Sequence, residues 1–417
     1  MSQSAYPATN APAAQAPAAS KPQSMYFVNF FVDFFFVGGA SILLYLFLKS
    51  TLVELIDIRD INRADEAAAA VAASKKPIAF SVLQFISLAN FLVLIGNWPH
   101  FSATNYRLYQ SKENIMQYPF TAMAVPFLVF GAVLASFASK DNIAPIFIKF
   151  YLMWSSYHFC GQTVGITLIY ARRAGVQVQR WERFALSGFL YATFIKGMAL
   201  GDFVQDFNTI QVPGFGLPQW FKDATTVWLY ISSGLLVLAV ISWNVRARKM
   251  IPIIVVVPAL AQLVWFVIAN DSNSTFQCAG FNYLVPFFHS IQYLLIAWGL
   301  QLKEKMDREH IDPSVRYVTL ETLRWWAINI AGGVFLFWLL PRIFSYPETR
   351  DIRESSFWIE GIVIAGVQVH HFFVDGVIWK LRRTTVSSPL MVNIDELIHA
   401  PLSAPVAVSA SNAEAPK

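Results

Sequence analysis

Apolar residues run through this chain in long stretches that are separated by short polar links. A transmembrane helix needs about 20 mostly apolar residues to cross the hydrocarbon core of a bilayer. Ten stretches approach or reach this length, so the pattern predicts an all-α fold, a polytopic transmembrane helical bundle of about ten spans. The ten stretches are residues 25–48, 78–100, 118–137, 143–170, 184–200, 226–243, 251–269, 281–302, 325–344 and 358–379.

The composition supports a membrane environment. Hydrophobic residues make up 56% of the 417 residues and charged residues only 14%, whereas a soluble globular chain is about one quarter charged. A soluble domain of this length could not bury so much apolar surface in one core. The lipid bilayer is therefore the expected main partner of the chain.

The two ends of the chain differ from its middle. Residues 1–24 are rich in Ala, Pro, Ser and Gln, and they lack the basic and apolar regions of a cleavable signal peptide. Residues 384–417 have a similar character towards their end. Such segments bury too little apolar surface to fold. We expect disordered tails at 1–24 and 384–417, and a transmembrane helical domain at 25–383.

Basic residues cluster in alternate links, which predicts an orientation. The clusters lie at 172–183, 244–249, 303–310 and 380–383, and positive charge next to a span favours the cytoplasmic side. A multi-pass protein of the inner, cytoplasmic membrane with both termini in the cytoplasm fits this bias, although the basic link 49–77 runs against it. The net charge of +5 is explained by these links, and no nucleic-acid partner is expected.

Five of the seven histidines lie in or at the edge of apolar stretches: His100, His158, His289, His370 and His371. Ionisable side chains at membrane depth are costly, and they usually face the interior of a bundle. A single one is most often an interhelical hydrogen-bonding group, but four stretches here each carry at least one. His100 is the shallowest, and a kink at Pro99 in a longer helix from about Phe80 to Tyr109 would place it deeper.

A polar residue follows one helical turn after each of these positions: Thr104, Gln162, Tyr293 and Asp375. Residues four apart share a helix face, and a metal-bound histidine needs a partner for its second ring nitrogen. The spacing therefore predicts one metal site shared by four helices. Adjacent residues on a helix point about 100° apart, so only one of His370 and His371 is expected to face it, and the pattern leaves open which.

The type of cofactor follows less directly from the residues. Neutral imidazole suits zinc, copper, iron and nickel. The His-Glu-x-x-His pattern of zinc hydrolases is absent, as are the histidine boxes HxxxH and HxxHH of membrane desaturases. A mononuclear Fe(II) site with open positions for dioxygen fits best, and a haem held by two histidines is the alternative.

The histidine segments resemble those of the Brp/Blh-type membrane β-carotene dioxygenases. The matching residues are Pro99-His100, His158-Phe159 with Gly161, His289-Ser290, and His370 with Asp375 five residues later. Carboxylates of the family are replaced by Thr104/Asn105 and Gln162, and a further family histidine by Tyr293. The resemblance implies that the histidines bind a non-haem iron, which cleaves a polyene with dioxygen.

Together these features predict an oxidoreductase, an intramembrane iron-dependent oxygenase or dioxygenase that acts on a lipophilic small molecule such as a carotenoid or another polyene. The expected ligands are His100, His158, His289 and His370. Asp375 would orient a ligand, and Tyr293 and Gln162 would donate hydrogen bonds nearby. The aromatic residues Trp154, Phe287, Phe288, Phe372 and Phe373 would line an apolar channel.

Two other functions remain open at this stage. The chain could be a haem-binding membrane electron-transfer protein with quinone as its partner, or a proton-coupled transporter in which the histidines and Asp375 relay protons. The sequence carries no signal for an oligomeric state.

Overall fold

The computed structural model describes residues 25–50, 52–56, 74–270, 281–310, 314–345 and 355–379. The tails expected at 1–24 and 384–417, and most of the link 49–77, lie outside these residues. Two small sheets occur in the described part. Strand β1 (Val53–Ile56) pairs in parallel with β2 (Ile78–Ser81), with Val53 opposite Ile78. Strand β3 (Gln205–Phe207) forms an antiparallel hairpin with β4 (Ile210–Val212).

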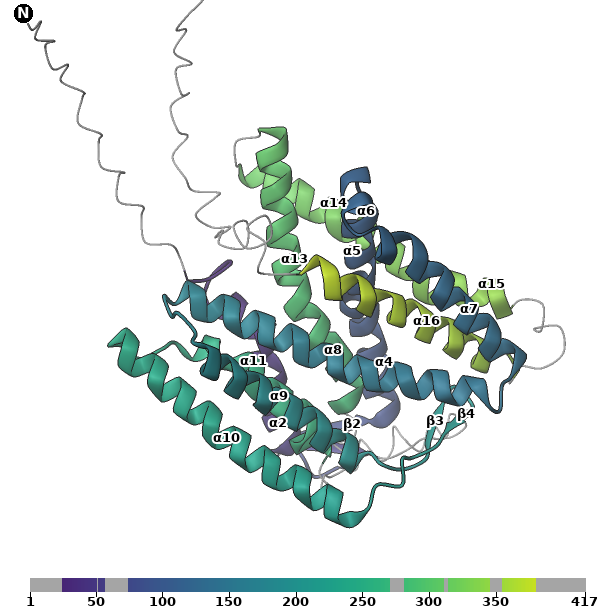
Figure 1. The fold of residues 1–417 in the computed structure, drawn as a ribbon, viewed down its shortest axis with the longest axis horizontal. Coiled ribbons are helices and arrows are strands. Elements are labelled where there is room, and N and C mark those ends of the chain that lie inside the picture. The colour runs from purple at the N-terminus through teal and green to yellow at the C-terminus, as the bar shows by residue number, and fades with distance from the viewer. Residues whose placement is uncertain are drawn as a thin grey trace, which may run out of the picture.

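Helices make up most of the described chain (Figure 1). The first part contains α1 (Phe30–Phe34), η1 (Phe35–Gly39), α2 (Ala40–Lys49), α4 (Val82–Leu92), η3 (Val93–Asn97), α5 (Trp98–Tyr109), α6 (Lys112–Gln117), η4 (Phe120–Ala124), α7 (Val125–Ala138) and α8 (Ile143–Arg173). The second part contains α9 (Arg180–Leu200), α10 (Gln219–Ala247), η5 (Ile253–Val255), α11 (Val257–Phe266), η6 (Ile268–Asn270), η7 (Asn282–Leu284), α13 (Val285–Glu309), α14 (Val315–Val334), η8 (Phe335–Leu339), α15 (Leu340–Ser345) and α16 (Ser355–Ile378).

Five helical segments of the described chain are long and apolar enough to cross a membrane: Phe30–Lys49, Phe120–Ala138, Gln219–Ala247, Val315–Ser345 and Phe357–Ile378. The chain is therefore an all-α protein of the membrane class, as predicted. The expected count of ten spans is not confirmed. Helices such as α8 and α13 occupy predicted stretches, but their lysine, arginine and site residues lower their hydropathy.

Helix α10 shows how the apolar surface is arranged. Only 28% of its most apolar window is buried, and Val227, Tyr230, Ile231 and Leu238 are each more than half exposed. A soluble protein rarely exposes so large an apolar patch. This face is suited to contact with lipid.

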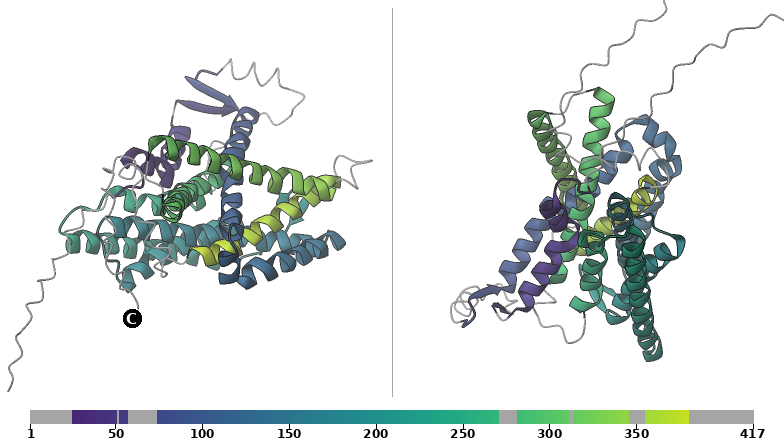
Figure 2. Two further views of the ribbon diagram at one scale, coloured as in Figure 1. Left: turned by 90° about the horizontal axis from the view of Figure 1, so that it is seen from above. Right: turned by 90° about the vertical axis from the view of Figure 1, so that its left-hand side faces the viewer.

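The long helices pack in two directions. Helix α9 lies between α8 and α10, and α16 packs against α7 and α8 (Figure 1). Helix α5 packs against α13, α14 and α16, and it runs across α14 (left view of Figure 2). The interior of the bundle is thus enclosed by α5, α8, α13 and α16, which come from distant parts of the chain.

Helical structure is continuous from Val82 to Tyr109, which confirms a longer second helix. Its irregularity is a π-helical turn, η3, directly before Pro99. Proline has no N–H to donate within the helix, and its ring crowds the preceding turn. The turn is tied to α13, because Asn97 Nδ2 donates to the carbonyl oxygen of Pro286 and to Ser290 Oγ, at 3.2 and 2.8 Å. This arrangement carries the next turn of α5 into the interior.

Candidate metal centre

Four histidines from four helices meet in the interior. His100 comes from α5, His158 from α8, His289 from α13 and His371 from α16. The ligand atoms of His100, His158 and His289 lie within 4.8 Å of one another, and so do those of His158, His371 and Asp375. The two groups share His158 and form one cluster, which we call the histidine cluster.

The spacing of the rings is compatible with a bound metal ion. The ring centroids lie 4.5 Å apart for His100 and His371, 5.1 Å for His158 and His371, 5.3 Å for His158 and His289, 5.4 Å for His100 and His289, and 6.4 Å for His100 and His158. Imidazoles bound to one ion at about 2.1 Å place their centroids about 4.5 Å apart in neighbouring positions and about 6.5 Å apart in opposite ones.

The ring nitrogens of the cluster have few partners. Both ring nitrogens of His100 and of His371, and Nε2 of His158 and of His289, are buried without a hydrogen-bond partner among the described residues. Buried polar side-chain atoms almost always have a partner, and an exception calls for an explanation such as an ion. Neutral imidazole nitrogens are common metal ligands. The donor set therefore fits a transition-metal ion.

The polar residues predicted one turn after each histidine do lie at the site, but they serve a different helix. Gln162 follows His158, yet its amide nitrogen donates to the carbonyl oxygen of His289 at 2.8 Å and lies 3.2 Å from His289 Nδ1. Asp375 follows His371, yet its Oδ2 lies 3.6 Å from Nε2 of His158. Each of these two polar side chains thus lies beside a histidine of another helix rather than beside the histidine of its own helix.

The Gln162 amide affects which ring nitrogen of His289 can bind a metal ion. Ligation through Nε2 requires the ring proton on Nδ1, where an acceptor must then stand. The Gln162 Oε1 atom is buried without a hydrogen-bond partner among the described residues. Turning the amide about its terminal bond would bring this oxygen to Nδ1, but it would also set it against the carbonyl oxygen of His289, which accepts from the amide nitrogen at 2.8 Å. The assignment of amide oxygen and nitrogen is a matter of the hydrogen-bond network rather than of atom positions.

Asp375 is held by a second set of polar groups. Trp379 Nε1 donates to Asp375 Oδ1 at 3.0 Å, and the Thr104 hydroxyl lies 3.2 Å from the same oxygen. The Tyr293 hydroxyl lies 2.6 Å from Thr104 Oγ1. A carboxylate only accepts, so Thr104 is the donor in its contact with Asp375. The carbonyl oxygen of His100, also 3.2 Å away, competes for the same hydroxyl proton.

Stacked rings fix the orientation of His289. The Phe159 ring lies parallel to His289, with centroids 3.6 Å apart and an angle of 8°, and Phe266 stacks behind Phe159 at 5.9 Å. Phe159 and Trp379 were not assigned a role from the sequence. The spacing of Trp379 four residues after Asp375 was a usable signal, whereas nothing in the sequence pairs Phe159 with a histidine on another helix.

His370 does not join the cluster, so of the two adjacent histidines between which the sequence could not choose, His371 is the one that faces the other three. His370 is partly exposed, and its Nε2 lies 3.3 Å from the Tyr109 hydroxyl. His371 is fully buried and faces the other three histidines. The physical reason is the rotation of about 100° between adjacent residues of a helix.

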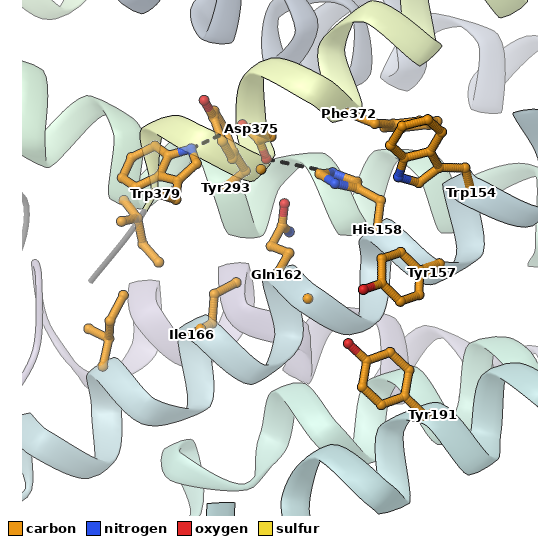
Figure 3. A pocket seen from close by; sticks show the side chains of 15 residues that line it. Trp154, Tyr157, His158, Gln162, Ile166, Tyr191, Tyr293, Phe372, Asp375 and Trp379 are labelled. Atoms are coloured by element: carbon orange, nitrogen blue, oxygen red, sulfur yellow. Dashed lines mark hydrogen bonds and ion pairs between the residues drawn. The ribbon is translucent and has the colours of Figure 1, made fainter. Parts of the chain in front are cut away.

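A cavity of about 390 Å³ borders the cluster on one side (Figure 3). Its wall contains His158 and Asp375, whereas His100, His289 and His371 do not line it. Of the aromatic residues expected to form a channel, Trp154 and Phe372 line this cavity. Phe287, Phe288 and Phe373 do not.

Bare backbone forms part of the cavity wall. Gly161 and Gly165 of α8 and Gly376 of α16 line the cavity, and a Cβ atom added at any of them would meet nothing within 4 Å. Larger side chains at these positions would therefore extend into open space rather than into the fold.

Comparison with protein-family models, with curated proteins and with solved structures finds no match to this chain. The chemistry of the site is therefore inferred from its own residues. Four imidazoles and one carboxylate, buried beside a mostly apolar cavity, can hold an ion such as iron, zinc or copper. They can also present it to an apolar molecule, because ligand pockets are largely apolar with a few placed polar groups.

Proposed function

We propose that this chain is a membrane-embedded non-haem iron oxygenase that acts on a lipophilic substrate taken from the bilayer. The observation that carries the proposal is the convergence of four buried histidines with unpartnered ring nitrogens beside an apolar cavity. The sequence resemblance to membrane dioxygenases favours a polyene as the substrate and iron as the metal. His100, His158, His289 and His371 are the proposed ligands.

The packing of the rings favours a single ion over a haem. Two imidazoles that hold a haem lie on opposite faces of the porphyrin, which needs a flat open space between them. The His100 and His158 rings alone have the separation of two haem ligands, 6.4 Å. The His289 and His371 rings, however, each lie 4.5 to 5.4 Å from both of them and occupy the plane that a porphyrin would need.

The cavity supports entry of the substrate from the side. Tyr157 lines the cavity, is 51% exposed at the surface of α8, and stacks on Tyr191 of α9 at 5.5 Å. Figure 3 shows both phenol rings at one end of the cavity, away from Trp379. An apolar molecule in the bilayer would pass between α8 and α9 and reach His158 without crossing water.

Bound Fe(II) would supply the redox chemistry and the binding position for dioxygen. Cleavage of a carbon–carbon double bond by dioxygen forms two carbonyl groups, which take both oxygen atoms, so no external reductant is needed. The residues of the chain hold the ion, and Gln162 and Phe159 fix the plane of His289. The apolar wall excludes water, and the Tyr293–Thr104–Asp375 hydrogen bonds hold a carboxylate beside His158.

The metal and the reaction are tested on the purified full-length protein in detergent. We expect about one equivalent of iron after anaerobic loading with Fe(II), no Soret band, and oxygen uptake that depends on an added polyene. A haem spectrum, or no uptake of Fe(II), would contradict the proposal. Proton uptake into vesicles by metal-free protein would instead favour a transporter.

The cavity is tested by filling it. Gly165→Leu should lower kcat/KM for the lipophilic substrate by roughly 10- to 100-fold, because the new side chain occupies substrate space. Iron content should be unchanged, since nothing lies within 4 Å of the added Cβ. Gly131→Leu is the matched control, because Gly131 of α7 is equally uncrowded but does not line the cavity. Equal losses in both variants would show that this cavity is not the substrate site.

A further inference from the structure

The two oxygens of the Asp375 carboxylate have different surroundings. Oδ1 accepts hydrogen bonds from Trp379 and Thr104. Oδ2 faces His158, whose Nε2 lies 3.6 Å away. That separation is too long for a hydrogen bond. Among the described residues, Oδ1 thus has two hydrogen-bond donors, whereas Oδ2 faces the ring nitrogen of His158.

Two imidazoles share the space in front of Oδ2. The ligand atoms of His158, His371 and Asp375 lie within 4.8 Å of one another. His158 Nε2 and both ring nitrogens of His371 are buried without a hydrogen-bond partner among the described residues. A buried carboxylate needs a counter-charge or hydrogen bonds at both oxygens. A divalent cation between these three side chains would supply the charge and occupy all three groups.

The cavity touches the same side of the cluster. Of the four clustered histidines and Asp375, only His158 and Asp375 line it. Two histidines and one carboxylate are the donor set of many non-haem Fe(II) oxygenases, which keep open positions for dioxygen and substrate. An ion at this end of the cluster would border the cavity, whereas an ion among His100, His158 and His289 alone would lie behind His158.

We propose that Asp375 binds the metal directly through Oδ2, so that the ion lies against His158, His371 and Asp375 at the cavity wall. This inference rests on the proposed metal site, but it assigns Asp375 a role as a ligand rather than as a group that only orients a histidine. Thr104 and Trp379 are then positioning residues, since they hold Oδ1 and turn Oδ2 towards the ion.

The test uses Mn²⁺ as a paramagnetic probe in full-length protein that carries ¹³C-carboxylate-labelled aspartate. We expect a resolved ¹³C hyperfine coupling to Mn²⁺ in the wild type. Asp375→Asn should abolish the coupling and weaken Mn²⁺ binding by at least about 100-fold, beyond the usual effect of losing a hydrogen-bond partner of a ligand. Circular dichroism of each variant checks that the helices remain folded.

Thr104→Val and Trp379→Phe are the matched controls, because each removes one donor to Oδ1 and leaves Oδ2 in place. They should keep the coupling and weaken binding by about tenfold. Bound Mn²⁺ without a ¹³C coupling in the wild type would overturn the role of Asp375 while leaving the histidine site intact. A clear coupling in protein that never oxidises a polyene would support the ligand and refute the oxygenase. No Mn²⁺ binding at all would overturn the metal site and this inference together.

Discussion

Two groups of buried polar side chains lie in this helical bundle, and they differ in how their atoms are satisfied. The first, which we call the N-terminal polar cluster, consists of Asp33, Tyr170 and Arg173. Asp33 is fully buried and accepts from the backbone amides of Phe27 and Val28, at 2.6 and 3.0 Å, and from the Tyr170 hydroxyl at 2.8 Å.

Arg173 completes that cluster. It donates from Nε to the carbonyl oxygen of Met25 at 3.0 Å and from an Nη atom to that of Tyr26 at 2.5 Å, and its guanidinium lies over the Phe27 ring. These contacts hold the segment before α1 against α8. The N-terminal polar cluster therefore stabilises the fold by itself and has no need of a ligand.

The histidine cluster is similarly buried, but most of its ring nitrogens have no hydrogen-bond partner among the described residues. His100 and His371 make no hydrogen bond through either ring nitrogen within the described part of the chain. Leaving a buried polar group unpaired costs about 1–3 kcal/mol, so several such groups in one place lower the stability of the folded protein. The contrast teaches that burial alone does not indicate a functional site, whereas buried ring nitrogens that lack hydrogen-bond partners and converge on one point do.

The largest expected effect is the loss of metal from the histidine cluster. His158→Ala should weaken Fe(II) binding by about a thousandfold, or roughly 4 kcal/mol, because His158 belongs to both ligand groups. His370→Ala is the control, since it removes an imidazole from the same bundle without touching the cluster. Metal titration of both variants measures this. Similar affinities for the two variants would remove the basis for calling the cluster a metal centre.

A smaller effect, on stability, is expected at the N-terminal polar cluster. Asp33→Ala should lower the free energy of unfolding by about 3 kcal/mol, because it leaves two backbone amides and the Tyr170 hydroxyl without their acceptor. Unfolding in mixed detergent micelles measures this change. Asn29→Ala, which removes the N-cap of α1, should cost only about 1 kcal/mol. Metal affinity should stay constant in both, and a loss of metal in Asp33→Ala would break the distinction between the clusters.

The smallest effect is expected at His289, the histidine of the cluster whose ring contacts the Gln162 side chain. Gln162→Leu should weaken metal binding by about tenfold, the usual result of removing the group that orients a ligand. Gln162→Glu places an acceptor at His289 Nδ1 and should keep the affinity near that of the wild type. If leucine and glutamate have the same effect, Gln162 only fills space beside His289.

The sequence predicted the helices well, because each of the ten apolar stretches is mainly helical in the described structure. The exception is the start of the second stretch, where Ile78–Ser81 form strand β2. The sequence could not choose between His370 and His371. Residues around them are apolar on every side of α16, as in AGVQVHHFFV, so the hydrophobic pattern carries no information about the direction of either side chain. The choice depends on which face of α16 packs against α5 and α8, and that is a tertiary property.

The hydrogen-bond partners show the same limit. The four-residue spacing identified Thr104, Gln162 and Asp375 correctly as residues near the site, because one helix face lines it. The spacing also suggested that each partner serves the histidine of its own helix, and this was wrong for Gln162 and Asp375. The distance between neighbouring helices decides which imidazole ring a side chain reaches. The spacing of residues along one helix carries no information about that distance.

The exchange of partners between helices has a consequence for biosynthesis. His158 emerges from the ribosome well before Asp375 and His371, which lie on the last of the four helices to be made. Until α16 is inserted, the earlier helices hold imidazoles without a complete set of donors. If the proposed ion is held by His371 and Asp375, its binding would follow synthesis and insertion of the whole bundle.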